Sequence, residues 1–312
     1  MSFEPRLLTI AGSDSGGAAG LQADLKTFTA LGAYGMSVTT LLTAQNSLGV
    51  HAVQALPVAF IEAQLEAVLS DLGVDSLKTG LLGRVDIIEL VAAKLAALDC
   101  PKVIDPVIVN GQGERIVEAG VLEAYQQLFK QATLITPNIR EAQHFAGLTI
   151  NHPEDMATAA QVMLASGAKA VLVKGGYLPE RAGLDCLCVA GKEPLWLEAD
   201  TTTTPNTHGT GCTLAAACAT YLATEPLTPE QLVTNTKADT KTNTKAGTKT
   251  GTEVGTKTDD DHNDNDAATH IEQAVRRAKA FVTGAIVAGA KRRIGQGRGP
   301  VKHTWQHQPH RY

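Results

Sequence analysis

The chain has 312 residues, of which 44% are hydrophobic and 19% are charged, and its formal net charge is −5. This composition is enough for one large α/β core, and the absence of a basic stripe with interleaved aromatic residues argues against a nucleic-acid partner. No apolar run reaches the roughly 20 residues that a membrane-spanning helix requires, and the first residues lack a signal-peptide pattern. We therefore expect a cytoplasmic protein that acts without a membrane or a nucleic acid.

Short apolar runs alternate with longer amphipathic segments along the chain. The short runs predict buried strands at residues 7–10, 37–42, 103–105, 134–136 and 170–173. Apolar residues at helical spacing predict helices at residues 58–72, 87–98, 120–132 and 154–166. Strands that alternate with helices of this length predict an α/β fold with three layers, α/β/α, around a mainly parallel central sheet.

Polar and glycine-rich motifs follow several of the predicted strands. Gly12-Ser13-Asp14 comes after the first strand, Asp105-Pro106 and Thr136-Pro137-Asn138 after later ones, and Lys174-Gly175-Gly176 after another. In parallel sheets, ligands bind beyond the carboxyl ends of the strands. The sequence therefore predicts one ligand site at this edge of the sheet.

One segment breaks this pattern. Between residues 234 and 269 the only large aliphatic residue is Val254, no aromatic residue occurs, and Thr-Lys pairs recur before an acidic run. Such a segment cannot bury enough apolar surface to offset the entropy of ordering it. We predict a single domain over residues 1–312, interrupted by a disordered low-complexity insertion at about 234–269, between a helix that begins near Cys212 and one through residues 271–287.

A glycine-rich turn precedes the first of these two helices. Thr210-Gly211-Cys212-Thr213 leads into an alanine-rich stretch with high helix propensity. The start of a helix presents free backbone N–H groups and the positive end of the helix dipole, which together bind an anion. Gly209 and Gly211 leave room for a phosphoryl group to approach closely. Taken alone, the motif is also compatible with an ordinary glycine turn.

Further motifs occur in the order typical of one family. They are Ala11-Gly12-Ser13-Asp14 with the segment to Lys26, Thr43-Ala44-Gln45-Asn46, Asp105-Pro106-Val107, Thr136-Pro137-Asn138 with the segment to Glu141, Val173-Lys174-Gly175-Gly176, Asn206-Thr207-His208-Gly209 with the segment to Thr213, and the segment 295–301. In these motifs the chain resembles the ribokinase-like superfamily, in its hydroxymethylpyrimidine/phosphomethylpyrimidine kinase branch. The resemblance covers most of the chain outside the insertion.

The resemblance implies an enzyme that uses ATP and Mg²⁺ to phosphorylate 4-amino-5-hydroxymethyl-2-methylpyrimidine and its monophosphate, in the biosynthesis of thiamine diphosphate. It places the anion hole at Gly209, Thr210, Gly211 and the Cys212 amide. Cys212 stands where most of the superfamily has an aspartate base. Because a helix N-terminus can lower the pKa of a thiol, we expect Cys212 to accept the proton of the substrate hydroxyl. The alternative is that a small residue merely fits there and that the alcohol loses its proton late.

The resemblance also assigns the residues that hold the nucleotide and the metal. Asn138, Lys174 and Thr210 are expected to contact the phosphates of ATP, and Lys174 also belongs to the catalytic set. Glu141 and Asp105 are expected at the Mg²⁺ ion, which prefers oxygen ligands. Considered alone, Glu141 is also an ordinary residue at a helix start, and Asp105 an ordinary turn cap before Pro106.

The substrate assignments involve fewer residues. By resemblance, the amide of Gln45 reads the pyrimidine ring, because it offers both a donor and an acceptor. Gly12 and Asp24 are expected in the pocket for the hydroxymethyl end. Two other functions remain open: a pyridoxal or pyridoxine kinase with the same fold and anion hole, and a pyrimidine-binding sensor without catalysis. The resemblance further suggests a homo-oligomer, a dimer.

Three histidines near the end of the chain have the appearance of a metal cluster. They are His303, His307 and His310. Because chain ends are usually poorly ordered, we expect these side chains to be solvated rather than to bind a metal.

Overall fold

The computed structural model describes residues 4–109, 117–178, 180–200, 202–224 and 259–307. The strands are β1 (Arg6–Asp14), β2 (Tyr34–Asn46), β3 (Gly49–Ala55), β4 (Ser76–Thr79), β5 (Lys102–Ile104), β6 (Leu134–Ile135), β7 (Ala170–Val173), β8 (Asp185–Val189) and β9 (Leu195–Leu197). They form one sheet in the order β3-β2-β1-β4-β5-β6-β7-β8-β9. Pairing is parallel from β2 to β7 and antiparallel at the edges, where β3, β8 and β9 join. The predicted mainly parallel sheet is confirmed.

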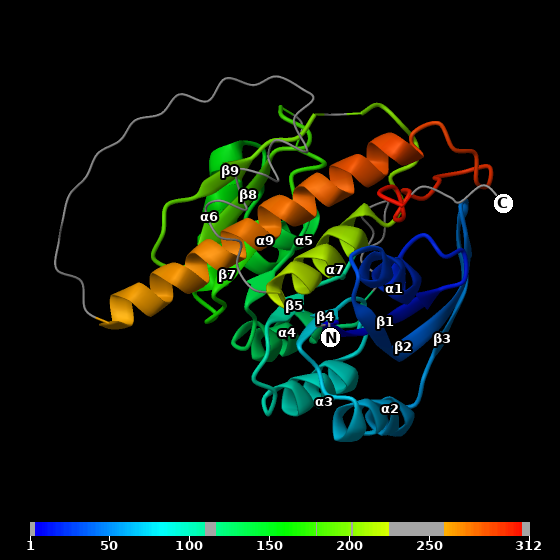
Figure 1. Cartoon of the computed structure of the whole chain (residues 1–312), viewed down its shortest axis with the longest axis horizontal. Coiled ribbons are helices and arrows are strands. Elements are labelled where there is room, and N and C mark those ends of the chain that lie inside the picture. The colour runs from blue at the N-terminus through cyan, green and yellow to red at the C-terminus, as the bar shows by residue number, and fades with distance from the viewer. Residues whose placement is uncertain (1–3, 110–116, 179, 201, 225–258, 308–312) are drawn as a thin grey trace.

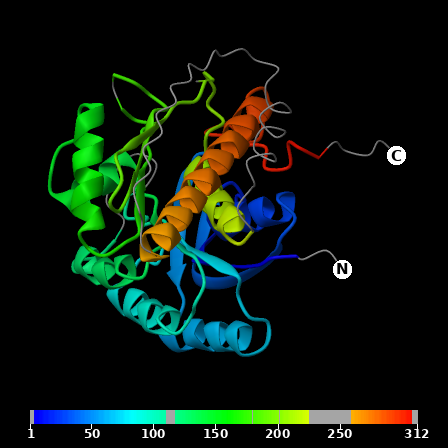
Figure 2. The same cartoon turned by 60° about the vertical axis from the view of Figure 1, so that its left-hand side comes forward.

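Helices cover both faces of the sheet (Figures 1 and 2). One layer consists of α2 (Val58–Asp71), α3 (Val85–Leu95), α4 (Val121–Phe129), α5 (Ile139–Ala146) and α6 (Pro153–Leu164). The other layer consists of α1 (Gly20–Ala30), α7 (Thr210–Leu222) and α9 (Asp259–Gly289). The predicted three-layer α/β/α architecture is therefore also confirmed.

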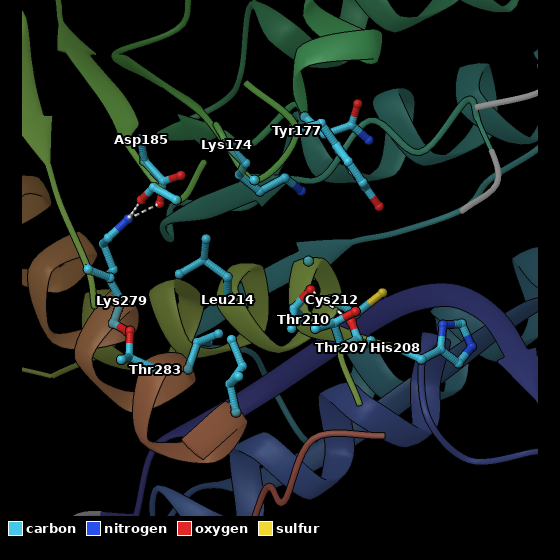
Figure 3. A pocket seen from close by; sticks show the side chains of 18 of the residues that line it. Lys174, Tyr177, Asp185, Thr207, His208, Thr210, Cys212, Leu214, Lys279 and Thr283 are labelled. Atoms are coloured by element: carbon cyan, nitrogen blue, oxygen red, sulfur yellow. Dashed lines mark hydrogen bonds and ion pairs between the residues drawn. The ribbon is translucent and has the colours of Figure 1, made fainter. Parts of the chain in front are cut away.

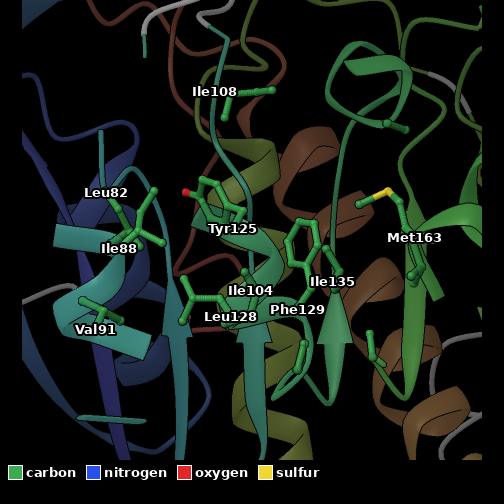
Figure 4. Close-up of a cluster of buried hydrophobic side chains, with 14 of the residues drawn as sticks. Leu82, Ile88, Val91, Ile104, Ile108, Tyr125, Leu128, Phe129, Ile135 and Met163 are labelled. Atoms are coloured by element: carbon green, nitrogen blue, oxygen red, sulfur yellow. The ribbon is translucent and has the colours of Figure 1, made fainter. Parts of the chain in front are cut away.

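Two hydrophobic cores separate the sheet from the two helix layers. Successive residues of a strand point to opposite faces, so Ile104 of β5 enters the core with α3 and α4, whereas Val103 enters the core with α7 and α9. Figure 4 shows the first core, in which Tyr125, Leu128 and Phe129 of α4 pack against the sheet. With both faces buried, the central strands β5, β6 and β7 are almost wholly apolar, which is why the sequence reveals them.

Strands β3 and β4 were not predicted from the sequence, and both lack this apolar pattern. β3 is exposed along nearly its whole length, so it has no buried face to mark it. β4 carries Lys78, which is fully buried because it pairs with Asp24. A buried ion pair between distant residues cannot be read from the local sequence of either one.

The predicted insertion is too long at its carboxyl end. Helix α9 begins at Asp259, so residues 259–269 are helical rather than disordered. The reason is the later part of the same helix, where Ile271, Val275 and Phe281 are buried against α7 and stabilise the helix. Residues 234–258 lie outside the described part of the chain.

None of the described helices is long and apolar enough to cross a membrane.

Candidate active site

A cleft of about 510 Å³ opens where the carboxyl ends of β5, β6 and β7 meet the amino end of α7. Eight of the predicted site residues line it: Asp105, Asn138, Glu141, Lys174, Gly209, Thr210, Gly211 and Cys212. Figure 3 shows Lys174 and Tyr177 on one side of the cleft and Thr210 and Cys212 on the other. The expected position of the site, beyond the strand ends, is therefore where the cleft lies.

The turn before α7 has a backbone that only glycine fits. Gly209 has a φ of +83°, and a Cβ atom there would lie 1.7 Å from the carbonyl oxygen of Ala18. Helix α7 begins at the next residue, so the N–H groups of Gly211 and Cys212 belong to its first turn and have no acceptor within the helix. These N–H groups line the cleft and form the geometry of an anion hole.

Lys174 provides the positive charge opposite this turn. Its Nζ lies 2.8 Å from Oδ1 of Asp105, which also accepts a hydrogen bond from the Thr136 hydroxyl at 3.0 Å. A Cβ atom at Gly211 would lie 3.3 Å from Nζ of Lys174, so the ammonium group is directly beside the anion hole. Burial lowers the pKa of Lys174, but Asp105 and Glu141 outweigh burial and raise it above its ordinary value. Lys174 is therefore charged at neutral pH.

Asn138 and Glu141 form a capping box at the start of α5. Oδ1 of Asn138 accepts the N–H of Glu141 at 3.0 Å, and Oε2 of Glu141 accepts the N–H of Asn138 at 2.8 Å. Burial raises the pKa of Glu141, Lys174 opposes this shift, and the nearby charge of Asp105 adds to it. The Asn-x-x-Glu motif thus fixes the helix start and at the same time places a buried carboxylate in the cleft wall.

The two carboxylates of the cleft can be compared with the needs of a metal ion. Within the described residues, no group of three or more His, Cys, Asp or Glu side chains could hold a metal. Mg²⁺ usually binds through one or two carboxylates together with substrate phosphates and water. Asp105 and Glu141 fit that arrangement. Burial and, to a smaller extent, the charge of Asp105 raise the pKa of Glu141, and a bound cation would favour its ionised form.

The thiol of Cys212 differs from expectation. Burial raises its pKa to about 11, although the charge of Lys78 acts in the opposite direction. The backbone N–H of Gly20 donates a hydrogen bond toward the sulfur, which also lowers the pKa but does not offset burial. The lowering of this pKa that was expected from the helix N-terminus is therefore not found, and the thiol keeps its proton at neutral pH in the free enzyme.

The three predicted substrate residues occupy different environments. Asp24 is fully buried, where it pairs with Lys78 at 2.9 Å and accepts the Thr9 hydroxyl at 2.6 Å, and it does not line the cleft. Gly12 is also buried, and a Cβ atom there would lie 2.8 Å from Cδ1 of Leu41. Gln45 does not line the cleft either, but its amide Nε2 lies 2.9 Å from Nε2 of His208, a residue of the cleft wall.

His208 is a residue of the site to which we assigned no role from the sequence. Its Nε2 lies 3.7 Å from Oδ2 of Asp14, whose carboxylate also accepts the N–H groups of Gly16, Ala18 and Ala19 at the start of α1. Burial raises the pKa of Asp14, but His208 and these N–H groups outweigh it and lower the pKa below its ordinary value. Nε2 of His208 thus lies between an ionised carboxylate and the amide nitrogen of Gln45, and the tautomer of the ring sets whether it donates toward Asp14 or accepts from Gln45.

The far end of the cleft is more apolar and comes largely from α9. Leu214 of α7 and Val282 and Ile286 of α9 line it, next to the ion pair between Lys279 and Asp185 at 2.6 Å. Figure 3 shows this ion pair at the opposite end of the cleft from His208. No sequence motif marks these residues, because their role depends on how α9 packs against α7.

A cleft with a helix N-terminus, a facing lysine and two buried carboxylates on this fold defines a small-molecule kinase of the ribokinase-like class. The chain belongs to the phosphomethylpyrimidine kinase family, whose family model matches residues 14–257. It is 40% identical over 302 residues to the hydroxymethylpyrimidine/phosphomethylpyrimidine kinase of Streptomyces coelicolor, covering 96% of this chain and 95% of that protein. Identity to the Haemophilus influenzae kinase of the same name is 38% over 311 residues, covering 97% and 98%.

Solved structures give a second set of relatives. The ADP complex of Bacillus subtilis pyridoxal kinase superposes with a TM-score of 0.78 at 33% identity, covering 97% of this chain and 99% of that one. Phosphomethylpyrimidine kinase from Clostridium difficile 630 superposes with a TM-score of 0.64 at 36% identity, covering 75% and 99%. The ribokinase-like fold and the kinase class expected from the sequence are both confirmed.

Proposed function

We propose that this protein transfers the γ-phosphoryl group of ATP to the hydroxyl of 4-amino-5-hydroxymethyl-2-methylpyrimidine and then to the resulting monophosphate, which provides the pyrimidine half of thiamine diphosphate. The observation that carries this proposal is the Lys174 ammonium beside the free N–H groups of Gly211 and Cys212. A binding protein without catalysis has no need for such a concentration of positive charge around a transferred group.

The residues act mainly by positioning and by stabilising charge. In phosphoryl transfer, negative charge spreads over the three oxygens of the moving group, and little covalent help is needed. The N–H groups of Gly211 and Cys212 and the ammonium of Lys174 face these oxygens in our proposal, with Thr210 and Asn138 on the phosphates of ATP. Asp105 and Glu141 would hold Mg²⁺, which neutralises phosphate charge when it is bound.

The adenine of ATP is proposed to lie at the far end of the cleft. Leu214, Val282 and Ile286 provide an apolar surface there. The related pyridoxal kinase from Staphylococcus aureus has been solved with ADP and with AMP-PCP.

Cys212 contributes its backbone N–H to the anion hole, whereas the role of its side chain is less direct. A protonated thiol cannot accept a second proton under physiological conditions, so a base role requires the thiolate. Because burial raises the pKa of Cys212 to about 11, the geometry of the free enzyme favours the alternative in which the alcohol loses its proton late. A loose transition state permits this order of events.

Product analysis by mass spectrometry tests the proposal directly. The purified chain with ATP, Mg²⁺ and the hydroxymethylpyrimidine is expected to yield first the monophosphate and then the diphosphate ester. Tight binding of the pyrimidine without turnover would instead identify a sensor.

A pyridoxal or pyridoxine kinase is the second candidate, because structures of pyridoxal kinases superpose over more of this chain than that of phosphomethylpyrimidine kinase. The two ring systems place their hydrogen-bonding groups differently. Gln45→Ala is therefore expected to impair turnover of the pyrimidine more than turnover of pyridoxal, and equal losses would contradict the role of Gln45.

We further propose a homodimer formed through the β2–β3 hairpin. Within the described chain, β3 is an edge strand, and Leu48, Val50 and Val53 of the hairpin are each more than half exposed. Exposed apolar side chains on an edge strand indicate a partner surface. Analytical ultracentrifugation tests this, with Val53→Lys expected to shift the protein toward monomer.

A further inference from the structure

Arg298 lies in a segment that connects two parts of the site. Its backbone N–H donates to the carbonyl of Ser47 at 2.9 Å, in the turn between β2 and β3. On the other side, Gly299 accepts the N–H of His208 at 3.0 Å. Gly297 cannot be replaced without a clash, because a Cβ atom there would lie 2.1 Å from the oxygen of Ser47. The segment is thus fixed between the substrate-side hairpin and the loop that leads into the anion hole.

The guanidinium group of Arg298 reaches the wall of the cleft. Its Nη2 and Nε donate to the hydroxyl of Thr207 at 2.9 and 3.2 Å. A guanidinium group has five N–H donors, so this one neutral acceptor leaves most of its donor capacity unused. Thr207 is itself joined to the first residue of α7, because the Thr210 hydroxyl donates to its carbonyl at 3.1 Å. The cation is therefore held at the entrance to the anion hole.

The other cations of the cleft have partners. Lys174 pairs with Asp105 and Lys279 with Asp185, while the guanidinium carbon of Arg140 lies 5.0 Å from the centre of the Tyr177 ring. Arg298 has no salt bridge to any carboxylate in the described part of the chain. A half-buried cation beside an anion site, with a hydroxyl as its side-chain partner, is arranged to receive a negatively charged ligand.

The position of Arg298 favours the acceptor substrate over the nucleotide. Its neighbour His208 contacts Gln45, the proposed reader of the pyrimidine, and Ser47 follows Gln45 in the same hairpin. The surface proposed for adenine, at Val282 and Ile286, comes from α9 at the other end of the cleft. Arg298 therefore lies on the acceptor side of the anion hole.

We propose that Arg298 binds the phosphate of the monophosphate substrate and so supports the second phosphorylation specifically. This inference rests on the proposed kinase function. In the second transfer, an oxygen of the monophosphate forms the new bond to the γ-phosphorus of ATP, the bond to the β-phosphate oxygen breaks, and ADP leaves. That oxygen already lacks a proton, so no base is needed, but two anions must be brought together. A planar guanidinium group, which binds phosphate through two parallel hydrogen bonds, reduces this repulsion.

Separate kinetics for the two acceptors test the proposal. In Arg298→Gln we expect the KM for the monophosphate to rise about 10- to 100-fold, the range for loss of a hydrogen-bonded charge, while the KM values for the alcohol and for ATP change far less. Arg298→Lys keeps the charge but loses the planar fork, so its KM for the monophosphate should lie between those of the wild type and Arg298→Gln. Arg293→Gln is the matched control, because Arg293 is exposed and does not line the cleft. Calorimetric titration of the monophosphate without ATP should show the same loss of affinity.

The possible outcomes separate clearly. Equal losses for both acceptors together with a lower melting temperature would mean that Arg298 only fastens its segment to Thr207, and the proposal would be overturned. A rise in the KM for ATP alone would assign the residue to the nucleotide and overturn it as well. Failure of the wild-type chain to phosphorylate the alcohol would instead contradict the proposed function, and the calorimetric comparison would still test Arg298.

Discussion

Two lysine–aspartate pairs lie against the same sheet and differ in what surrounds them. Lys78 and Asp24 are both 0% exposed and lie 2.9 Å apart, closed off between α1 and β4. Lys174 and Asp105 lie 2.8 Å apart at the ends of β7 and β5, and 14% of the Lys174 side chain remains exposed to the cleft. The pairs contain the same two residue types at almost the same distance. Their roles are therefore set by access to a ligand, so that one is expected to support the fold and the other the reaction.

The largest effect is expected at the closed pair. Lys78→Met should lower the free energy of unfolding by about 3–5 kcal/mol, because Asp24 would be left buried without a counter-charge. Urea denaturation measures this, and the double variant Lys78→Met/Asp24→Leu should recover much of the loss. Lys94→Met is the control, since Lys94 pairs with Glu62 and Glu66 at the surface and should contribute no more than about 1 kcal/mol. Similar losses of unfolding free energy in Lys78→Met and Lys94→Met would show that burial does not set the contribution of the Lys78–Asp24 pair.

The open pair should affect catalysis instead. Lys174→Met is expected to lower kcat/KM by about 10²–10³-fold, because one preorganised donor to the transferred group is lost. The free energy of unfolding should change less than in Lys78→Met, since the Lys174 side chain is partly exposed to the cleft and its loss opens Asp105 toward water. Steady-state kinetics and urea denaturation on the same preparation compare the two effects. A destabilised variant that retains wild-type turnover would reverse the assignment.

Glu141 lies against the open pair, and its pH dependence sharpens the comparison. The pKa of Glu141 is raised in the folded state, so its contribution to stability is full below its unfolded pKa and is lost as the pH rises through the folded pKa. Glu141→Gln should therefore raise the melting temperature by about 2–4 °C at pH 8 and change it little at pH 4, while kcat/KM falls. Thermal denaturation across this pH range measures the effect.

Glu123→Gln is the matched control, because Glu123 is an exposed residue in the first turn of α4. If Glu141→Gln stabilised the protein equally at both pH values, burial of the carboxylate would not be the cause.

Charges from both pairs shift the pKa of Cys212: Lys78 lowers it, whereas Asp24 and Asp105 raise it. With a pKa of about 11, the thiol should react only slowly with iodoacetamide at pH 7, as peptide mapping by mass spectrometry can show. Cys212→Ser should reduce kcat/KM by about 10-fold or less, below the roughly 10²-fold minimum typical of a general base. The base role would be restored by a larger loss of kcat/KM, if the wild type also shows an increase in kcat/KM at alkaline pH that Cys212→Ser lacks.

The parts of the site made by backbone were predictable from the sequence. Gly209 and Gly211 before an alanine-rich helix specify a free helix N-terminus locally, and strand-end motifs placed Asp105 and Lys174 at the same edge. Asp24 was expected in the substrate pocket by resemblance. Nothing in its local sequence reveals its buried partner Lys78, which lies 54 residues away. Long-range pairing of this kind is fixed only when the layers assemble.

The histidines near the end of the chain also have environments that depend on long-range packing. His303 was expected to be solvated, but it is 6% exposed, and its Nε2 lies 3.1 Å from the Thr213 hydroxyl of α7. His307 contacts the carbonyl of Ala30 at 2.9 Å, whereas His310 lies outside the described residues. His307 is nevertheless exposed, as expected, so tail position was a poor guide to the environment of His303 but not to that of His307.

Competition between two acceptors is the most direct test of the central claim. The wild-type chain should be given equal concentrations of the hydroxymethylpyrimidine and pyridoxal with limiting ATP and Mg²⁺, and both phosphorylated products quantified by mass. We expect the pyrimidine ester to form in excess and then to be converted to the diphosphate. Predominant formation of pyridoxal phosphate, with no diphosphorylated pyrimidine, would contradict the proposed function.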